Sequence, residues 1–99
     1  MDLTVADDPA NNRYTLVEAG GADPIGFADY RRRGTTWIFT HTVIDPHDGR
    51  RGLGSTLVRS ALDDVRARGG QVLPHCPYVR GWIERHPEYA DLVAPAARG

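Results

Sequence analysis

The stretch DPHDGRRGLGS, residues 45–55, separates two parts of the sequence that follow different patterns. Asp45-Pro46 ends any preceding strand, because proline has no backbone N–H and the residues around it favour turns. Up to about Thr42 polar and apolar residues alternate as in β-strands, whereas beyond the stretch apolar residues recur at helical spacing. The sequence therefore predicts an α+β domain, with antiparallel strands first and helices after them.

Three alternating segments in the first part are expected to be strands: Arg13–Ala19, Ile25–Arg32 and Thr35–Ile44. Short runs rich in glycine separate them, so neighbouring strands run antiparallel. Strict alternation along the third segment places four side chains on one face: Trp37, Phe39, His41 and Val43. Residues 1–10 are expected to be a frayed end.

A helix is expected from about Leu53 to Gly69-Gly70, with Ser55 as its N-cap. Residues 71–74 form a short strand, parallel to strand 35–44 because the helix between them makes a crossover connection. Pro77 suits the first turn of a C-terminal helix, and Pro87 ends it. Residues 94–99 are expected to fray, so the chain is one minimal domain over residues 1–99.

Composition excludes several classes of function. The chain has 99 residues and a net charge of −1, which leaves no basic footprint for nucleic acid. All twelve basic residues are arginine, so a Schiff-base lysine and a phosphate-loop lysine are both absent. One cysteine and four scattered histidines match no metal spacing. With no apolar run of membrane length and no signal peptide, we expect a cytoplasmic protein with no membrane partner.

The stretch 45–55 is suited to a phosphate group, because its glycines leave backbone N–H groups accessible at a helix N-terminus. Gly49–Thr56 has the spacing of a Walker loop but carries Ser55 in place of the lysine. A dinucleotide-binding fold would need a longer chain and a larger parallel sheet. The remaining pattern, [QR]-x-x-G-x-[GA], is that of an acetyl-CoA loop, with Gly52 and Gly54 at its glycine positions.

The sequence resembles the GNAT N-acetyltransferase superfamily, and within it the minimal single-domain branch, over about residues 14–93. Four landmarks in order carry the resemblance beyond the RGLGS loop: His41-Thr42, Asp45-Pro46, Cys76-Pro77-Tyr78 and HPEYADLV at residues 86–93. Two positions depart from the pattern. Gly49 stands where the superfamily has Gln or Arg, and Val43 stands where this branch has a glutamate.

The resemblance implies a splayed pair of parallel strands, Thr36–Ile44 and Gln71–Pro74, with the pantetheine arm of acetyl-CoA bound between them. The residues implied to bind it, mostly through backbone groups, are Val43, Ile44, Arg50, Arg51, Gly52, Leu53, Gly54 and Ser55. Further strands that wall in the acceptor in ordinary GNAT enzymes have no counterpart in this sequence, so the acceptor site is expected to be open.

Three residues are candidates for catalysis. Cys76 is an acetyl-carrying nucleophile, a proton donor to the departing CoA thiolate or a wall of the site, or else it is a small buried hydrophobe in the core. His41 is either a general base, acting on an amine or on Cys76, or a histidine packed beside Trp37 and Phe39. Tyr78 either protonates the leaving thiolate or packs in the core.

The resemblance implies an acetyl-CoA-dependent N-acetyltransferase, in which an amine attacks the thioester directly. The alternatives are a non-catalytic acyl-CoA or CoA-binding module and a protein-interaction domain. CoA and an unidentified amine are the expected partners, and the chain is expected to be a monomer or a weak homodimer. The run Arg31-Arg32-Arg33 is either solvated or attracts an acidic acceptor or the 3'-phosphate of CoA.

Overall fold

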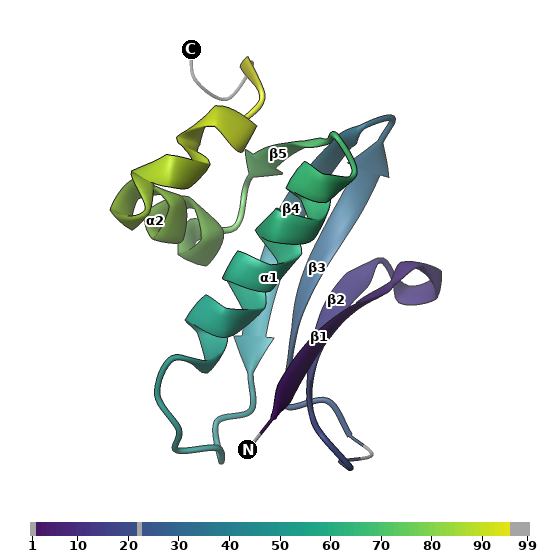
Figure 1. Ribbon diagram of the computed structural model, residues 1–99, viewed down its shortest axis with the longest axis vertical. Helices are drawn as coiled ribbons and strands as arrows, with labels where there is room; N and C mark the ends of the chain where they lie inside the picture. Colours follow the sequence, from purple (N-terminus) through teal and green to yellow (C-terminus); the bar gives the residue numbers. More distant parts are fainter. Residues whose placement is uncertain (1, 22, 96–99) are drawn as a thin grey trace.

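Five strands form one mixed sheet in sequence order, β1-β2-β3-β4-β5 (Figure 1). The computed structural model describes residues 2–21 and 23–95. Its strands are β1 (Leu3–Asp8), β2 (Arg13–Glu18), β3 (Gly26–Arg33), β4 (Thr36–Ile44) and β5 (Gln71–Pro74). Strands β1 to β4 pair antiparallel, and β5 pairs parallel to β4. The predicted α+β fold, with its parallel return strand, is confirmed.

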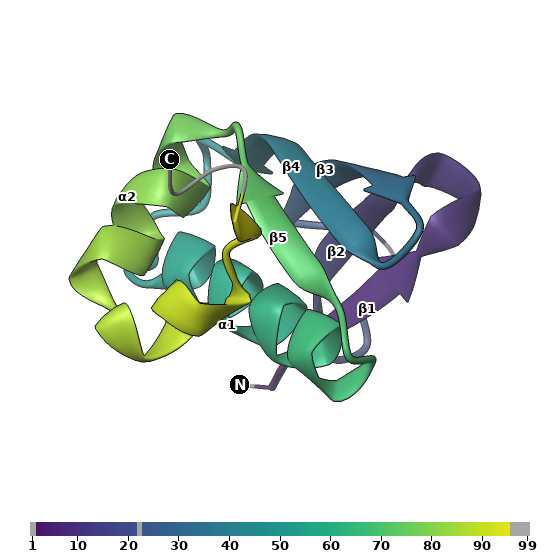
Figure 2. The same cartoon turned by 90° about the horizontal axis from the view of Figure 1, so that it is seen from above.

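The helices occupy one face of the sheet (Figure 2). Helix α1 (Leu53–Ala67) follows β4 and α2 (Pro77–Arg85) follows β5, with short 3-10 segments η1 (Pro9–Asn11) and η2 (Pro87–Leu92). Among the described residues no helix covers the other face, which we call the open face. None of the helices in the described chain has the length and hydropathy needed to cross a bilayer.

Strand β1 corrects the expectation that residues 1–10 fray. Leu3 and Val5 pack against the core, and the strand pairs with β2 from Leu3 opposite Glu18 to Asp8 opposite Arg13. The turn between them closes at Asn12, in the left-handed region with φ of 53°. The signal was weak because only two apolar residues alternate there. Of the residues expected to fray at the other end, Ala94 is buried, and residues 96–99 lie outside the described part of the chain.

The core lies between α1 and the sheet. Helix α1 buries one apolar stripe: Leu53, Leu57, Val58, Ala61, Leu62 and Val65. Large side chains of the sheet face this stripe, and each has at most 1% of its surface exposed: Tyr14, Leu16, Trp37, Phe39 and Val72. Burying one such side chain contributes roughly 1.5–3 kcal/mol. Gly70 lies against the ring of Trp37, and a Cβ there would overlap that ring.

A β-bulge in β4 changes which side chains face the core. His41 lies opposite Asp29, and Phe39 lies opposite Tyr30. Thr40, between them, is therefore an extra residue with no residue of β3 opposite it. An extra residue shifts the alternation by one. Trp37 and Phe39 are therefore buried, whereas His41 and Val43 are exposed. The expectation that these four share one face is wrong.

The ladder between β4 and β5 is short. It pairs Thr36 with Gln71 and ends where Phe39 lies opposite Pro74, which has no N–H to donate. One further bond follows, from the N–H of Cys76 to the carbonyl of Phe39 at 2.9 Å. Beyond Phe39, β4 continues to Ile44 without pairing to β5.

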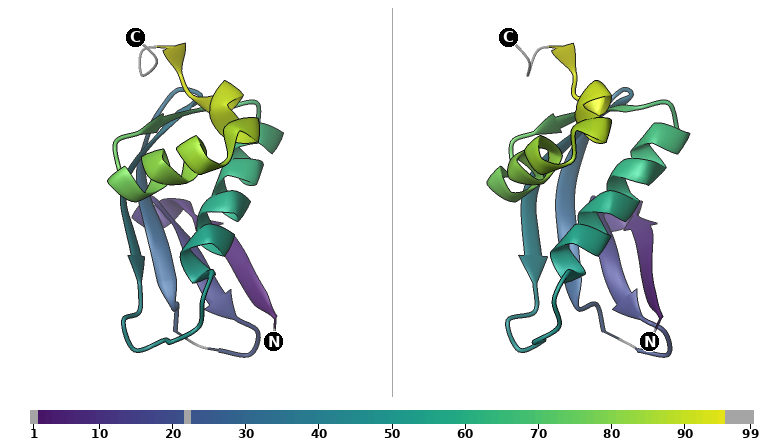
Figure 3. Two further views of the ribbon diagram at one scale, coloured as in Figure 1. Left: turned by 90° about the vertical axis from the view of Figure 1, so that its left-hand side faces the viewer. Right: turned by 60° about the vertical axis from the view of Figure 1, so that its left-hand side comes forward.

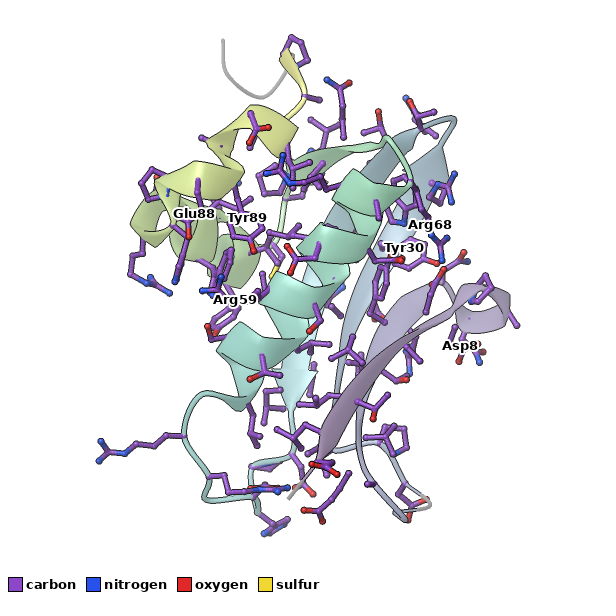
Figure 4. The ribbon with its side chains drawn as sticks, viewed as in Figure 1. Asp8, Tyr30, Arg59, Arg68, Glu88 and Tyr89 are labelled. Carbon is purple, nitrogen blue, oxygen red and sulfur yellow. The ribbon has the colours of Figure 1, made fainter. Side chains whose placement is uncertain are left out.

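Helix α2 and η2 are held to α1 by aromatic and polar contacts. Figure 4 shows Arg59 of α1 directed toward Tyr89 of η2, and its Nη1 lies 3.3 Å from the phenol oxygen. The same phenol donates to Oδ1 of Asp63 at 2.8 Å. The indole of Trp82 packs edge-on against Tyr89, with ring centroids 4.9 Å apart. These contacts fix the orientation of α2 relative to α1.

Two buried tyrosines on the sheet donate hydrogen bonds to carboxylates. The phenol of Tyr14 donates to Asp64 of α1 at 2.6 Å, and that of Tyr30 donates to Asp7 of β1. Burial, and then the neighbouring carboxylate, raises the pKa of each phenol well above its ordinary value. Burial also raises the pKa of Tyr89. The folded state therefore favours the protonated form of all three.

We expect the free energy of unfolding to fall as the pH rises above about 10, the pKa of an unfolded tyrosine. A phenol whose pKa is raised by folding stabilises the fold fully below that pH, and the contribution is lost as the pH rises toward the folded-state pKa. Tyr14→Phe should lower stability at pH 7 by about 1 kcal/mol and make the alkaline decline shallower. Urea denaturation between pH 7 and 11 measures both effects, and unchanged stability up to pH 11 would contradict the expectation.

Candidate functional site

A tight turn ends β4 and directs the chain toward α1. The carboxylate of Asp45 accepts a hydrogen bond from the N–H of His47 at 2.9 Å. The backbone carbonyl of Asp45 accepts one from the N–H of Asp48 at 3.1 Å. Pro46 occupies the second position of this turn, which its fixed φ favours. The strand therefore ends where the sequence predicted.

The N-terminus of α1 lacks a side-chain cap. Gly52 is the N-cap residue with a φ of 79°, and its carbonyl accepts the first helical bond, from the N–H of Thr56 at 2.9 Å. The N–H groups of Leu53, Gly54 and Ser55 precede that bond, and the first turn contains no acidic residue. These N–H groups and the helix dipole make a site of positive potential at this end.

Ser55 has a different role from the predicted N-cap. It lies inside the first turn of α1, and its Oγ accepts the indole N–H of Trp82 at 2.9 Å. This bond ties α2 to the beginning of α1. The prediction failed because the partner lies 27 residues further along the chain.

Arg50 is held by the protein's own carboxylates. Its Nη1 lies 2.7 Å from Glu18 at the end of β2, and its Nη2 lies 2.6 Å from Asp48. The guanidinium beside Asp48 lowers the pKa of that carboxyl to about 2. Arg50 therefore braces the loop, and its charge is balanced there. Arg51 is exposed, as is Gly49.

The register of β3 and β4 decides which backbone groups of β4 are directed toward β5. The N–H of Asp45 donates to the carbonyl of Ile25 at 2.8 Å, and bonded pairs alternate along an antiparallel ladder. Val43 therefore directs its N–H and carbonyl to β3. Thr42 and Ile44 direct theirs to the opposite side, beyond the end of the β5 ladder. We call this segment, residues 42–44, the free edge of β4. Of the two β4 residues predicted to bind the arm through backbone groups, Ile44 directs its groups to this edge and Val43 directs its groups to β3.

Cys76 lies beside the free edge. It is 4% exposed and is the N-cap residue of α2. Its Sγ lies 3.4 Å from the hydroxyl of Thr42. The sequence pattern assigned Thr42 no role of its own, because strict alternation places its side chain on the opposite face.

His41 projects from the open face. Its Nδ1 lies 3.2 Å from the hydroxyl of Thr40, and it is exposed. Of the two alternatives for His41, packing beside Trp37 and Phe39 is wrong, because the bulge turns the imidazole outward. The side chain that contacts the Cys76 sulfur is that of Thr42, so the structure brings Cys76 together with a hydroxyl and not with an imidazole.

Tyr78 lies in the first turn of α2, and 41% of its surface is exposed. Its phenol rests on Gly54, where a Cβ would lie 2.5 Å from the phenol oxygen. Glycine at this position therefore places Tyr78 at the uncapped helix end. The interpretation of Tyr78 as a core residue is wrong.

The arrangement combines a helix end of positive potential with strand backbone groups, a thiol and a phenol. Gly54 and Tyr78 are in contact, and so are Thr42 and Cys76, which is the N-cap residue of the helix that carries Tyr78. Within residues 2–21 and 23–95, no group of three His, Cys, Asp or Glu side chains gathers as a metal site would require. This combination suits an elongated ligand that bears phosphate and bonds to strand backbone.

Comparison with known proteins identifies the fold and the family. A solution structure of a GCN5-like protein from Staphylococcus aureus superposes with a TM-score of 0.68 at 17% identity, covering 93% of this chain and 88% of that one. A GNAT-family crystal structure from Desulfovibrio desulfuricans gives 0.54 at 24% identity, covering 74% of this chain and 51% of that one. No curated protein matches the sequence at a significant level. Residues 13–92 match the family model described as GCN5-related N-acetyl-transferase, and the chain therefore belongs to that family.

Proposed function

We propose that this protein binds acetyl-CoA and transfers its acetyl group to an amine. The observation that carries the proposal is the uncapped N-terminus of α1, which lies after the free edge of β4. A pyrophosphate at this helix end would accept bonds from the N–H groups of Leu53, Gly54 and Ser55. Gly52 has open space where a Cβ would stand, so an anion can approach the backbone closely.

The free edge of β4 suits the pantetheine arm, which carries two amide groups. Thr42 and Ile44 offer backbone groups that β5 does not use, and these would pair with the arm as a neighbouring strand does. The thioester would then lie near Thr42 and Cys76. A backbone N–H of β4 would polarise its carbonyl and stabilise the developing oxyanion.

The chemistry follows from this placement. The nitrogen of the acceptor amine attacks the carbonyl carbon, a C–N bond forms, the C–S bond breaks, and the sulfur leaves with the electron pair. His41 accepts the proton that the amine gives up, and the phenol of Tyr78 supplies a proton to the departing sulfur. The exposed position of His41 supports this role, since an amine approaching from the open face meets the imidazole first.

Cys76 is assigned to the wall of the site. A cysteine nucleophile is ordinarily activated by an adjacent base, and the neighbour of this sulfur is the Thr42 hydroxyl. The thiol is also buried, which is the usual condition of a structural cysteine. Attack by the amine on the bound thioester is the simpler route, because a second thioester of similar energy adds a step without a gain.

The first test measures CoA binding by calorimetry in a matched pair of glycine variants. Gly52 and Gly69 have φ of 79° and 73°, and a Cβ added at either would meet nothing within 4 Å, so alanine strains both about equally. Gly52→Ala should weaken CoA binding by about tenfold because its methyl group blocks approach to the helix end. Gly69→Ala, at the other end of α1, should bind CoA as the native protein does. Equal affinity in both variants would refute the assignment of the anion site.

The second test separates direct transfer from an acetyl-cysteine route. With an accepted amine, His41→Ala should lose about a hundredfold in kcat/KM, the lower range for loss of a general base. Cys76→Ala should retain most of the rate. His47→Ala is the control, since its imidazole lies in the turn before the loop and is exposed.

Acetyl-Cys76 detected by mass spectrometry at the rate of turnover would overturn the direct route. Full activity of His41→Ala would remove the histidine from the mechanism. CoA binding without turnover of any amine would favour the alternative of a non-catalytic CoA-binding module.

A further inference from the structure

The open face carries a hollow of about 380 Å³ where β3, β4 and β5 lie side by side. Its lining residues are Arg31, Arg32, Arg33, Ile38, Thr40, Leu73 and His75. The volume falls in the range of sites that take small molecules. No helix of the described chain covers this face, so the hollow is open to an incoming ligand.

The hollow is positively charged. Side chains along β3 point alternately to the two faces of the sheet, and that of Tyr30 is buried in the core. Arg31 and Arg33 are exposed, and their side chains therefore lie on the open face. Arg32 also borders the hollow, but its guanidinium lies over the ring of Trp37, 3.7 Å from the ring centre, and is not part of the proposed anion site. No carboxylate is among the lining residues, and the nearest one along β3, Asp29, is paired with Arg13 at 2.9 Å.

The hollow adjoins the reactive end of the candidate site. Thr40 lines it, and the hydroxyl of Thr40 lies 3.2 Å from Nδ1 of His41. On the other side His75 lines it, and Cys76 is the next residue. A small molecule held in the hollow therefore has His41 at its edge and the Cys76 backbone beside it.

The arginines of the hollow lie away from the phosphate end of the site. Figures 1 and 3 place the β3–β4 turn and the loop before α1 at opposite ends of the molecule. From Ile38 to Ile44 the strand rises roughly 20 Å at about 3.3 Å per residue. In CoA the pyrophosphate separates the pantetheine arm from the 3'-phosphate. An arm that runs along β4 from the α1 end thus directs the 3'-phosphate away from Arg31 and Arg33.

We propose that the acceptor is a small amine that also carries a carboxylate or phosphate group, bound through that group by Arg31 and Arg33. Guanidinium groups bind both kinds of oxyanion with paired hydrogen bonds. The acid group in the hollow would place the amine nitrogen next to His41. This inference rests on the proposed acetyl transfer and specifies its substrate class.

The test compares amines that differ mainly in charge, at low ionic strength. O-Phosphoethanolamine and β-alanine should be acetylated with kcat/KM at least tenfold above that of ethanolamine, and spermidine should be the poorest. The two acidic amines distinguish a phosphate site from a carboxylate site. Preference for ethanolamine, spermidine or an acidic peptide over both small acidic amines would overturn the inference.

Variants locate the effect. Arg31→Gln combined with Arg33→Gln should raise KM for the acidic amines at least tenfold, with kcat and the ethanolamine rate unchanged. Arg85→Gln, at the end of α2 and outside the hollow, is the matched control. In nuclear magnetic resonance titrations, β-alanine should shift the amide signals of β3 and of Thr40 in the native protein and not in the double variant. Unchanged KM or unshifted signals would contradict the assignment.

Failure of the inference is distinguishable from failure of the proposed function. CoA binding with turnover of ethanolamine, but without charge preference, would leave acetyl transfer intact and remove the acidic acceptor. No CoA binding by the native protein, and no turnover of any of the four amines, would overturn both.

Discussion

Strand β4 is one residue longer than the stretch of β3 it pairs with, and the layout of the site depends on that residue, Thr40. Phe39, which precedes Thr40, faces the core. After Thr40, His41 faces the open face and Thr42 faces the helices. Side chains on a strand alternate strictly, so only an extra residue can change the face on which they stand. The bulge thereby gives the site two sides, with a thiol and a hydroxyl toward the helices and an imidazole toward solvent.

The second constraint is the contact between the two helix beginnings. Trp82 uses the hydroxyl of Ser55, and Tyr78 rests on Gly54. A serine within the first turn that binds an indole cannot cap the helix, and a missing cap costs about 1 kcal/mol. The missing cap leaves the first backbone N–H groups of α1 without a side-chain partner. The same two contacts hold α2 over the beginning of α1.

The sequence predicted the features that depend on neighbouring residues. Alternation, the Asp45-Pro46 break and the helical stripe of α1 are local patterns, so the order of the elements and the position of the loop followed from them. The bulge at Thr40 does not disturb the alternation of polar and apolar residues in the sequence. Its one sign is a histidine, His41, at a position that alternation assigns to the core. The sequence wrongly indicates Ser55 as the N-cap and gives no sign of the ion pair between Arg50 and Glu18, because the partners of both residues lie far away in the chain.

The edge strand β1 was missed for a related reason. Only two apolar residues, Leu3 and Val5, alternate there, which is too short a pattern to indicate a strand. The strand is stabilised by its pairing with β2, which the local sequence does not show. The open face was foreseen only as an unwalled acceptor site. Its arginine-lined hollow lies on β3 and β4, which a short turn joins, and on β5, which the crossover through α1 brings beside β4.

Arg50 shows what a charged residue contributes apart from any contact with a ligand. Two carboxylates from different parts of the chain hold its guanidinium, and through it the loop is anchored to β2. The loop is therefore preorganised: its shape exists before any anion arrives. An anion that binds a preformed loop loses little free energy to ordering it. Affinity for an anion at this helix end would then depend on the geometry of fixed backbone N–H groups more than on the placement of a flexible side chain.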